Sequence, residues 1–131
     1  MPILKICFIY LMVIGGFSAS CQTSKKSIPQ VSSALYQYWI SSHEEDAGGV
    51  KVYRPKGYNF PPSRGRVGLN LHSDGTYIEY KIGPNDAPVA IPGKFILSED
   101  GKTVVLTPND GTKKESTFSI VELNKEILKV K

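Results

Sequence analysis

Apolar and polar residues alternate with a period of two through much of the chain from Leu35 to Lys131. Val67, Leu69 and Leu71 alternate with polar or small residues, and residues 76–82 continue the pattern. A period of two places successive side chains on opposite faces of a strand, so these stretches predict half-buried β-strands. In residues 76–82 one predicted face holds Thr76, Ile78, Tyr80 and Ile82, and the other holds Tyr77, Glu79 and Lys81.

Asp-Gly pairs separate several of these strands, at Asp74-Gly75, Asp100-Gly101 and Asp110-Gly111. Glycine readily adopts the positive φ of a tight hairpin, so these pairs predict an antiparallel meander. Strands are predicted at 35–42, 50–53, 66–72, 76–82, 94–97, 103–107, 114–123 and 126–131. No predicted helix is long enough to cover a sheet face, so the sheet must close on itself. The predicted fold class is all-β, a small antiparallel up-and-down barrel of about eight short strands.

The first residues have the layout of a bacterial secretory signal. Lys5 precedes the apolar run from Ile6 to Ile14, and small residues lead to Cys21. The run is too short for a transmembrane helix, which needs about 20 apolar residues. Residues 19–21 resemble the bacterial lipobox, which implies that Cys21 is the lipid attachment site and that residues 1–20 are a lipoprotein signal peptide. An ordinary cleaved signal is the alternative.

The segment after the signal has the composition of a tether. Residues 21–33 are rich in polar residues and contain only Ile28 and Val31 as large apolar side chains, so they predict a lipidated flexible linker. Residues 34–131 then form the barrel domain. Gln22 stands where enteric bacteria place an aspartate to retain lipoproteins in the inner membrane. By that resemblance, we expect an outer-membrane protein of the cell envelope, attached to the membrane through lipid and facing the periplasm.

Charge and cysteine content narrow the function classes further. The net charge of +4 is mild and the basic residues are scattered, so the chain lacks the clustered basic surface of a nucleic-acid-binding protein. The two cysteines are Cys7, inside the predicted signal, and Cys21. The mature domain therefore has no disulfide and depends on its core.

Several sequence features resemble one family. They are Leu35-x-x-x-Trp39, Pro-Pro-Ser-Arg-Gly-Arg at 61–66, Ser-Asp-Gly-Thr at 73–76, Ile-Gly-Pro-Asn-Asp-x-Pro at 82–88 and Gly-Lys-Phe at 93–95. Together they are similar to the small lipocalin-like lipoproteins of Bacteroidota. The resemblance implies an up-and-down β-barrel, mostly without assigned function. The chain has Gln37-Tyr38-Trp39 where lipocalins have Gly-x-Trp, and Lys129 where they place an arginine over that tryptophan.

The sequence offers little catalytic chemistry. His43 and His72 are the only side-chain bases that titrate near neutral pH, and neither stands in a known catalytic motif. His43-Glu44-Glu45-Asp46 lacks a spaced partner for a metal site and is interpreted as a solvated acidic loop. We therefore predict no enzymatic activity, no catalytic residues, no metal site and no cofactor.

Aromatic and basic residues provide the candidate binding site. Trp39, Phe95, Phe118 and Tyr80 are predicted to fill the barrel. The candidate ligand- or partner-binding residues are of two kinds. Those on the proline-rich loop from Arg54 to Arg66 and its edges are Tyr53, Arg54, Tyr58, Phe60, Arg64 and Arg66, and Tyr77 joins them at the barrel mouth. The alternative favoured by the residues alone is a lid: Tyr58 and Phe60 plug one barrel end, and Arg66 pairs with a carboxylate such as Glu79.

Two binding functions follow from these residues. In the first, a small apolar or amphiphilic ligand binds at a barrel mouth lined by Tyr53, Tyr58 and Tyr77, in a pocket of a few hundred cubic ångströms. In the second, the barrel is filled and an envelope protein binds an exposed patch on the Arg54–Arg66 loop. Strands this short favour a largely filled interior over a deep calyx.

Overall fold

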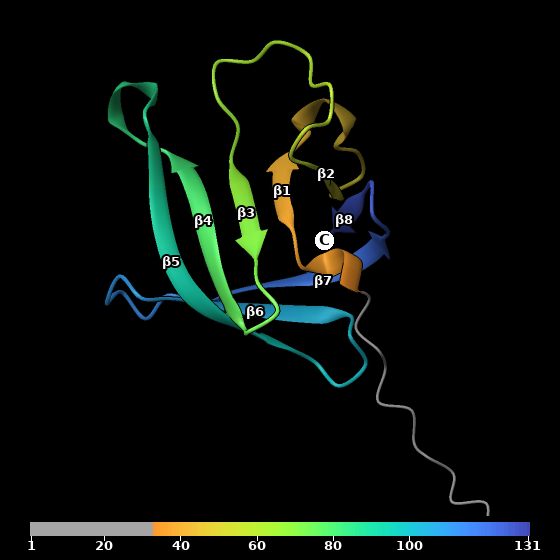
Figure 1. Ribbon diagram of the computed structural model, residues 1–131, viewed down its shortest axis with the longest axis vertical. Coiled ribbons are helices and arrows are strands. Elements are labelled where there is room, and N and C mark those ends of the chain that lie inside the picture. The colour runs from red at the N-terminus through yellow and green to blue at the C-terminus, as the bar shows by residue number, and fades with distance from the viewer. Residues whose placement is uncertain (1–32) are drawn as a thin grey trace, which may run out of the picture.

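Residues 33–131, which this computed structural model describes, form a closed antiparallel barrel, as the alternation predicted (Figure 1). The predictions for the signal peptide, Cys21 and the tether up to residue 32 lie outside the described residues. The strands are β1 Tyr38–Ser41, β2 Lys51–Pro55, β3 Gly68–Leu71, β4 Thr76–Ile82, β5 Pro88–Leu97, β6 Thr103–Pro108, β7 Ser116–Leu123 and β8 Leu128–Val130. Short 3₁₀ turns lie at η1 Ser33–Leu35, η2 His43–Glu45 and η3 Pro84–Asp86.

The strand order around the barrel is β1-β2-β8-β7-β6-β5-β4-β3. From β3 to β8 each strand pairs with the next, which gives the predicted meander. At the start, β1 lies between β2 and β3, so the connection over residues 56–67 must cross β1 to begin β3. Two backbone bonds fix the ends of this crossing: Lys56 N–H donates to the Tyr38 carbonyl, and Ser41 N–H donates to the Val67 carbonyl.

The three Asp-Gly turns share one hydrogen-bonding device. Asp74, Asp100 and Asp110 each accept the backbone N–H two residues later on Oδ1, and each following glycine has a positive φ. A hydroxyl side chain also donates to the same oxygen in each turn, from Thr76, Ser98 and Thr112 respectively. These side-chain bonds are the largest cause of the lowered pKa of all three aspartates. The turns are thereby built from local sequence, as predicted.

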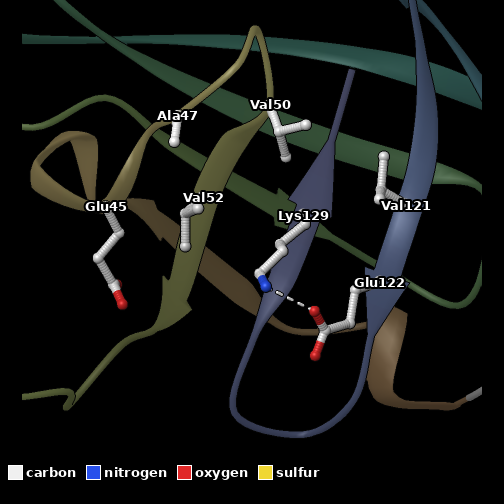
Figure 2. A pocket seen from close by; sticks show the side chains of 7 residues that line it. All are labelled: Glu45, Ala47, Val50, Val52, Val121, Glu122 and Lys129. Atoms are coloured by element: carbon white, nitrogen blue, oxygen red, sulfur yellow. Dashed lines mark ion pairs between the residues drawn. The ribbon is translucent and has the colours of Figure 1, made fainter.

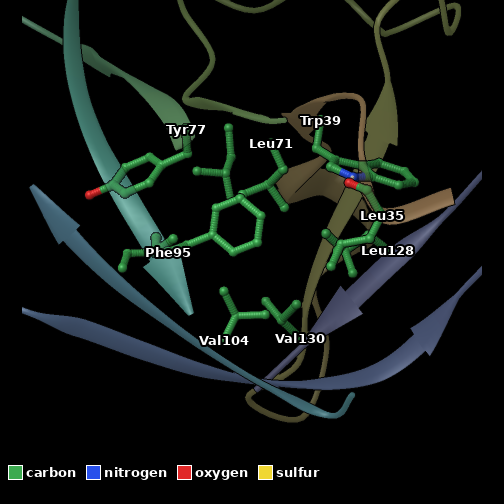
Figure 3. Close-up of a cluster of buried hydrophobic side chains, with 10 residues drawn as sticks. Leu35, Trp39, Leu71, Tyr77, Phe95, Val104, Leu128 and Val130 are labelled. Atoms are coloured by element: carbon green, nitrogen blue, oxygen red, sulfur yellow. The ribbon is translucent and has the colours of Figure 1, made fainter. Parts of the chain in front are cut away.

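The core fills the end of the barrel that η1 covers (Figure 3). Leu35 and Trp39 are completely buried, and the indole Nε1 donates to the Leu35 carbonyl at 3.0 Å. This bond satisfies the one polar group that the tryptophan brings into the core. The other buried members are Leu69, Leu71, Tyr77, Phe95, Val104, Leu106, Leu128 and Val130. The predicted opening strand over 35–42 is therefore a 3₁₀ turn followed by a shorter strand.

The register of β4 corrects one predicted core residue. Leu71 pairs with Tyr77 and Leu69 with Glu79, so the odd-numbered residues of β4 face the barrel interior with these buried leucines. Tyr80 faces outward instead and packs against Tyr38, with ring centroids 5.1 Å apart. Tyr80 was therefore wrongly predicted to fill the barrel, whereas Trp39 and Phe95 are buried there and Phe118 is packed against them.

Strand β5 begins six residues before the predicted start at Lys94. Its residues 88–94 pair with β4, but pairing with β6 covers only residues 93–97. On the side facing β6, the Pro92 carbonyl accepts a hydrogen bond from the Asn109 N–H, and the β5–β6 pairing begins one residue later, at Gly93. The N–H that proline lacks would point to this same side, just outside the β5–β6 ladder. The β4–β5 hairpin consequently extends beyond β6.

Strand β2 is longer than predicted. Arg54 and Pro55, which were predicted to lie in a loop, are its last two residues.

Candidate functional site

A cleft opens inside the barrel at the end opposite η1. Its larger part, here called the inner chamber, has a volume of about 280 Å³. Its lining combines apolar side chains, Leu69, Leu106, Phe118 and Val130 among them, with polar ones that include Lys51, Tyr53, Glu79, Ser116 and Lys131. The volume matches the few hundred cubic ångströms expected for a small ligand.

A second hollow, the side chamber, adjoins the first and has a volume of about 270 Å³. Glu79 and Ser116 line both chambers and so stand at their junction. The other lining residues include Tyr77, Lys81, Ile91, Asp110 and Lys114. This chamber lies where β5 projects past β6, because the proline-containing half of β5 has no β6 partner.

The polar side chains at the junction are little used by the fold. Among residues 33–131, nothing forms a side-chain hydrogen bond with Tyr53 or Glu79, and the ion-pair partner of Glu79 is Lys81 at 3.4 Å. Burial, followed by the charges of Glu79 and Asp46, raises the pKa of Tyr53. Its hydroxyl is therefore a protonated donor at neutral pH, in the same chamber as the Glu79 carboxylate.

Tyr77 contributes to the side chamber from the core. Its ring lies over Gly93, where an added Cβ would come within 2.6 Å of two ring atoms. The hydroxyl points away from the apolar cluster (Figure 3). Burial is the largest cause of its raised pKa, with Glu79 and Asp110 adding to it.

A separate cluster, here called the arginine clasp, holds the crossing connection against η2. It consists of Glu44, Glu45, Arg54, Tyr58, Phe60 and Arg66. Arg66 forms two bonds with the Glu44 carboxylate, at 2.8 and 2.5 Å, and Arg54 does the same with Glu45 at 2.8 and 2.5 Å. Such forked bonds match the guanidinium to the carboxylate and are the strong form of this contact.

The clasp also uses the remaining donors and faces of both arginines. Arg66 donates to the carbonyls of Ser41 and Pro61, and Arg54 donates to that of Glu126. The Arg54 guanidinium lies 5.0 Å from the Tyr58 ring centroid, and that of Arg66 lies 4.7 Å from the Phe60 centroid. The two rings meet edge to face at 5.0 Å. The clasp therefore contains the same three-residue arrangement two times: Glu45, Arg54 and Tyr58 form one set, and Glu44, Arg66 and Phe60 form the other.

The sequence placed these residues differently. Arg66 pairs with Glu44 rather than Glu79, because Glu79 faces the barrel interior. Tyr58 and Phe60 do not line the cleft and so do not plug the barrel. The segment interpreted as a solvated acidic loop is exposed, as predicted, but it forms a 3₁₀ turn whose two glutamates are paired with arginines.

The seven predicted binding residues consequently divide into groups. Arg54, Tyr58, Phe60 and Arg66 meet in the clasp, Tyr53 lines the inner chamber, and Tyr77 lines the side chamber from the core. Arg64 is exposed, and no partner for its side chain is found within the described part of the chain. Of the three tyrosines predicted to line the barrel mouth, Tyr53 and Tyr77 line the cleft and Tyr58 does not.

The exposed arginine patch predicted for a protein partner is also reduced. The side chains of Arg54 and Arg66 are only 19% and 11% exposed, and their donors are taken. Of the predicted binding residues on this loop, Tyr58, at 41%, and Arg64 remain exposed.

Glu79, Ser116 and Lys81 are cleft residues that the sequence interpretation missed as such. The sequence did contain a signal for Glu79 and Lys81, because they share the inward face of β4 with Tyr77. Pairing β3 with β4 across the Asp74-Gly75 turn aligns this face with the apolar residues Leu69 and Leu71, which assigns it to the barrel interior. Ser116 had no such signal, since the irregular stretch before β7 leaves the start of that strand undefined.

A third hollow, of about 420 Å³, lies on the outer surface beside β2, β8 and β7 (Figure 2). A bulge in β7 between Ile120 and Glu122 shifts its pairing with β8. The charged groups here are paired, Lys129 with Glu122 at 2.7 Å and Glu45 with Arg54. Lys129 alternates with the buried Leu128 and Val130 and faces outward, so it does not lie over Trp39.

Residues 33–131 contain no group of three or more histidine, cysteine or acidic side chains placed to hold a metal ion. No helix in that range has the length and apolar character needed to cross a membrane.

Comparison with known proteins identifies no relative from which a function could be transferred. No protein-family model, curated protein or solved structure matches the chain. The resemblance to small lipocalin-like lipoproteins therefore stays a prediction from the motifs, beside a barrel fold that the structure shows directly.

Proposed function

We propose that this protein is a lipid-anchored binding module of the cell envelope that holds a small apolar or amphiphilic ligand in the barrel cleft. The lipid on Cys21 would attach it to the outer membrane, with the barrel facing the periplasm. The barrel would act by binding, without catalysis and without a cofactor.

The observation that carries the proposal is the contrast between the two ends of the barrel interior. At the η1 end the side chains pack into a buried apolar core around Trp39. At the other end the same wall encloses the two chambers, with Tyr53 and Glu79 not hydrogen-bonded by other side chains of residues 33–131. Ligand sites commonly combine an apolar lining with a few convergent polar groups of this kind.

The placement of the histidines supports a binding role over catalysis. His72 lies at the β3–β4 turn, where its Nδ1 is 3.3 Å from the Thr76 hydroxyl, and His43 begins η2. Neither lines the two chambers. Glu79 and Ser116 share the junction, but a serine nucleophile needs an adjacent base within hydrogen-bond reach that is itself oriented by a third group.

The alternative function, recognition of an envelope protein through the Arg54–Arg66 loop, has weaker support. The clasp engages both arginines with carboxylates and carbonyls. A partner would have to compete with these bonds or bind through the exposed residues of the loop, which include Tyr58 and Arg64.

The proposal is tested by blocking the cleft. In Ser116→Phe an aromatic ring replaces the hydroxyl at the chamber junction, and in the control Ser119→Phe the same change falls on an exposed, outward position of β7. Full-length protein is extracted from its own membrane in mild detergent, and co-purifying molecules are measured by native mass spectrometry. We expect a bound small molecule in the parent and in Ser119→Phe, and its loss in Ser116→Phe. Equal retention in both variants would contradict a cleft ligand.

A further inference from the structure

The two chambers differ in chemistry, and the difference bears on the polar end of the ligand. The inner chamber has the larger apolar share, with Leu69, Leu106, Phe118 and Val130 in its lining, and its charged residues besides Glu79 are Lys51 and Lys131. The side chamber is lined by charged residues of both signs, Glu79 and Asp110 against Lys81 and Lys114. An amphiphile that enters the cleft would therefore place its apolar part in the first chamber and its polar part in the second.

We infer that the side chamber receives a zwitterionic head group, with its ammonium at Glu79 and its anionic group between Lys81 and Lys114. This inference rests on the proposed function and names the class of ligand. A lysolipid and a small lipidated amino compound share this chemistry.

The mixed charge of the chamber argues against the simpler head groups. A purely anionic group would meet the carboxylates of Glu79 and Asp110, and a purely cationic group would meet the two lysines. A head group with both charges can place each one beside an opposite charge. Lys81 lies between the two acids in its interactions, since it pairs with Glu79 and its charge helps lower the pKa of Asp110.

Glu79 is the acid that is available to a ligand. Asp110 Oδ1 already accepts the backbone N–H and the hydroxyl of Thr112, which commits that residue to its turn. Among residues 33–131, the ion-pair partner of Glu79 is Lys81, at 3.4 Å, and the Lys81 side chain is 53% exposed. An exposed pair of this kind contributes little to stability, so a ligand ammonium can replace the lysine at low cost.

The position of Glu79 couples head-group recognition to the apolar chamber. Because it lines both chambers, an ammonium beside it lies next to the apolar side chains of the inner chamber. Tyr53 lines that chamber together with Glu79 and supplies a hydroxyl donor there. Its partner would be the anionic or ester oxygen of the head group.

The experiment compares three probes with one alkyl chain: an alkyl phosphoethanolamine, an alkyl phosphate and an alkylamine. Binding to the full-length protein is measured by calorimetry below the critical micelle concentration. The variant is Glu79→Gln, which keeps the shape and removes the charge. The control is Glu122→Gln, which removes the charge of the other strand-borne Glu–Lys pair, on the outer surface.

The parent should bind the phosphoethanolamine best, and Glu79→Gln should weaken that binding by about tenfold, the loss expected for one charged hydrogen bond. The alkyl phosphate should bind Glu79→Gln no worse than the parent, and Glu122→Gln should match the parent throughout. Equal binding of all three probes by the parent, or no selective loss in Glu79→Gln, would overturn the head-group inference and leave a cleft ligand standing. Failure of every probe to bind the parent would overturn the inference and count against the proposed function as well.

Discussion

The arginine clasp and the barrel cleft use the same kinds of side chain in opposite ways. In the clasp, the guanidinium groups of Arg54 and Arg66 are engaged by carboxylates, carbonyls and ring faces. In the cleft, Tyr53 has no side-chain hydrogen bond to residues 33–131, and Glu79 has one long ion pair. Polar groups that the fold has already satisfied hold the structure together, whereas accessible polar groups in a hollow remain free for a ligand.

This contrast also explains why the clasp is needed. Because β1 lies between β2 and β3, the chain must cross β1 through residues 56–67, a segment with two prolines and outside the named strands. Arg54 and Arg66 stand at the two ends of that crossing, and η2 supplies both carboxylates. The basic and aromatic residues of this loop are thus accounted for by topology.

The largest expected effect is loss of the clasp. Arg66→Ala should lower the free energy of unfolding by about 1–3 kcal/mol, since it removes charged hydrogen bonds and leaves the Ser41 and Pro61 carbonyls without this donor. The measurement is urea unfolding. Arg64→Ala, on the same loop but exposed, should change stability by no more than about 0.5 kcal/mol. Equal effects of the two variants would contradict the clasp.

Acid should weaken the clasp at a lower pH than free carboxylates would allow. The bonds from Arg66 and Arg54 lower the pKa of Glu44 and Glu45 to about 2, from an ordinary value of 4.5. A lowered folded-state pKa gives stability that is present above 4.5 and is lost as the pH falls toward 2. Thermal unfolding from pH 6 to pH 2 should show this loss in the parent. A double variant Arg54→Ala, Arg66→Ala should show a flatter profile below pH 4.5, and parallel profiles would be inconsistent with the paired carboxylates.

The aromatic half of the clasp should matter less. Phe60→Leu removes the face beneath Arg66 and the edge contact with Tyr58 while keeping an apolar side chain. We expect a loss of about 0.5–1 kcal/mol in urea unfolding, the range of an exposed cation–π contact. If Arg66→Ala is made first, the added cost of Phe60→Leu should shrink, because the two residues act together. Full additivity would show that they do not.

The smallest effect on stability is expected in the cleft. Glu79→Gln should change the free energy of unfolding by no more than about 0.5 kcal/mol, since the pair with Lys81 is exposed and long. The same variant is expected to change ligand binding. A large loss of stability would instead show that the fold depends on Glu79 and would remove the distinction between the two regions.

The barrel was predictable because its information is local. Alternation, the Asp-Gly turns and the absence of a covering helix indicate a closed meander, and the hairpins from β3 to β7 have this form. The position of β1 between β2 and β3 was not predictable, since it depends on pairing between strands separated by a long loop. The position of β1 brings Arg66 to Glu44, while Glu79 lies on the inward face of β4, away from Arg66.

The inward face of β4 shows the limit of pattern alone. Both faces are mixed in polarity, and the more apolar one, with Ile78, Tyr80 and Ile82, faces outward. The register with β3 decides the matter, because it aligns Tyr77 with the buried Leu71. Apolar content would have misplaced both the core tyrosine and the cleft carboxylate.

The most direct test is ligand binding by three proteins in parallel: the parent, Arg66→Ala and Ser116→Phe. Binding of the alkyl phosphoethanolamine is measured under conditions in which unfolding experiments show all three to be folded. The account predicts that Arg66→Ala binds as the parent does, although it is less stable, and that Ser116→Phe does not bind. Loss of binding in Arg66→Ala together with full binding in Ser116→Phe would place the function on the loop and contradict the account.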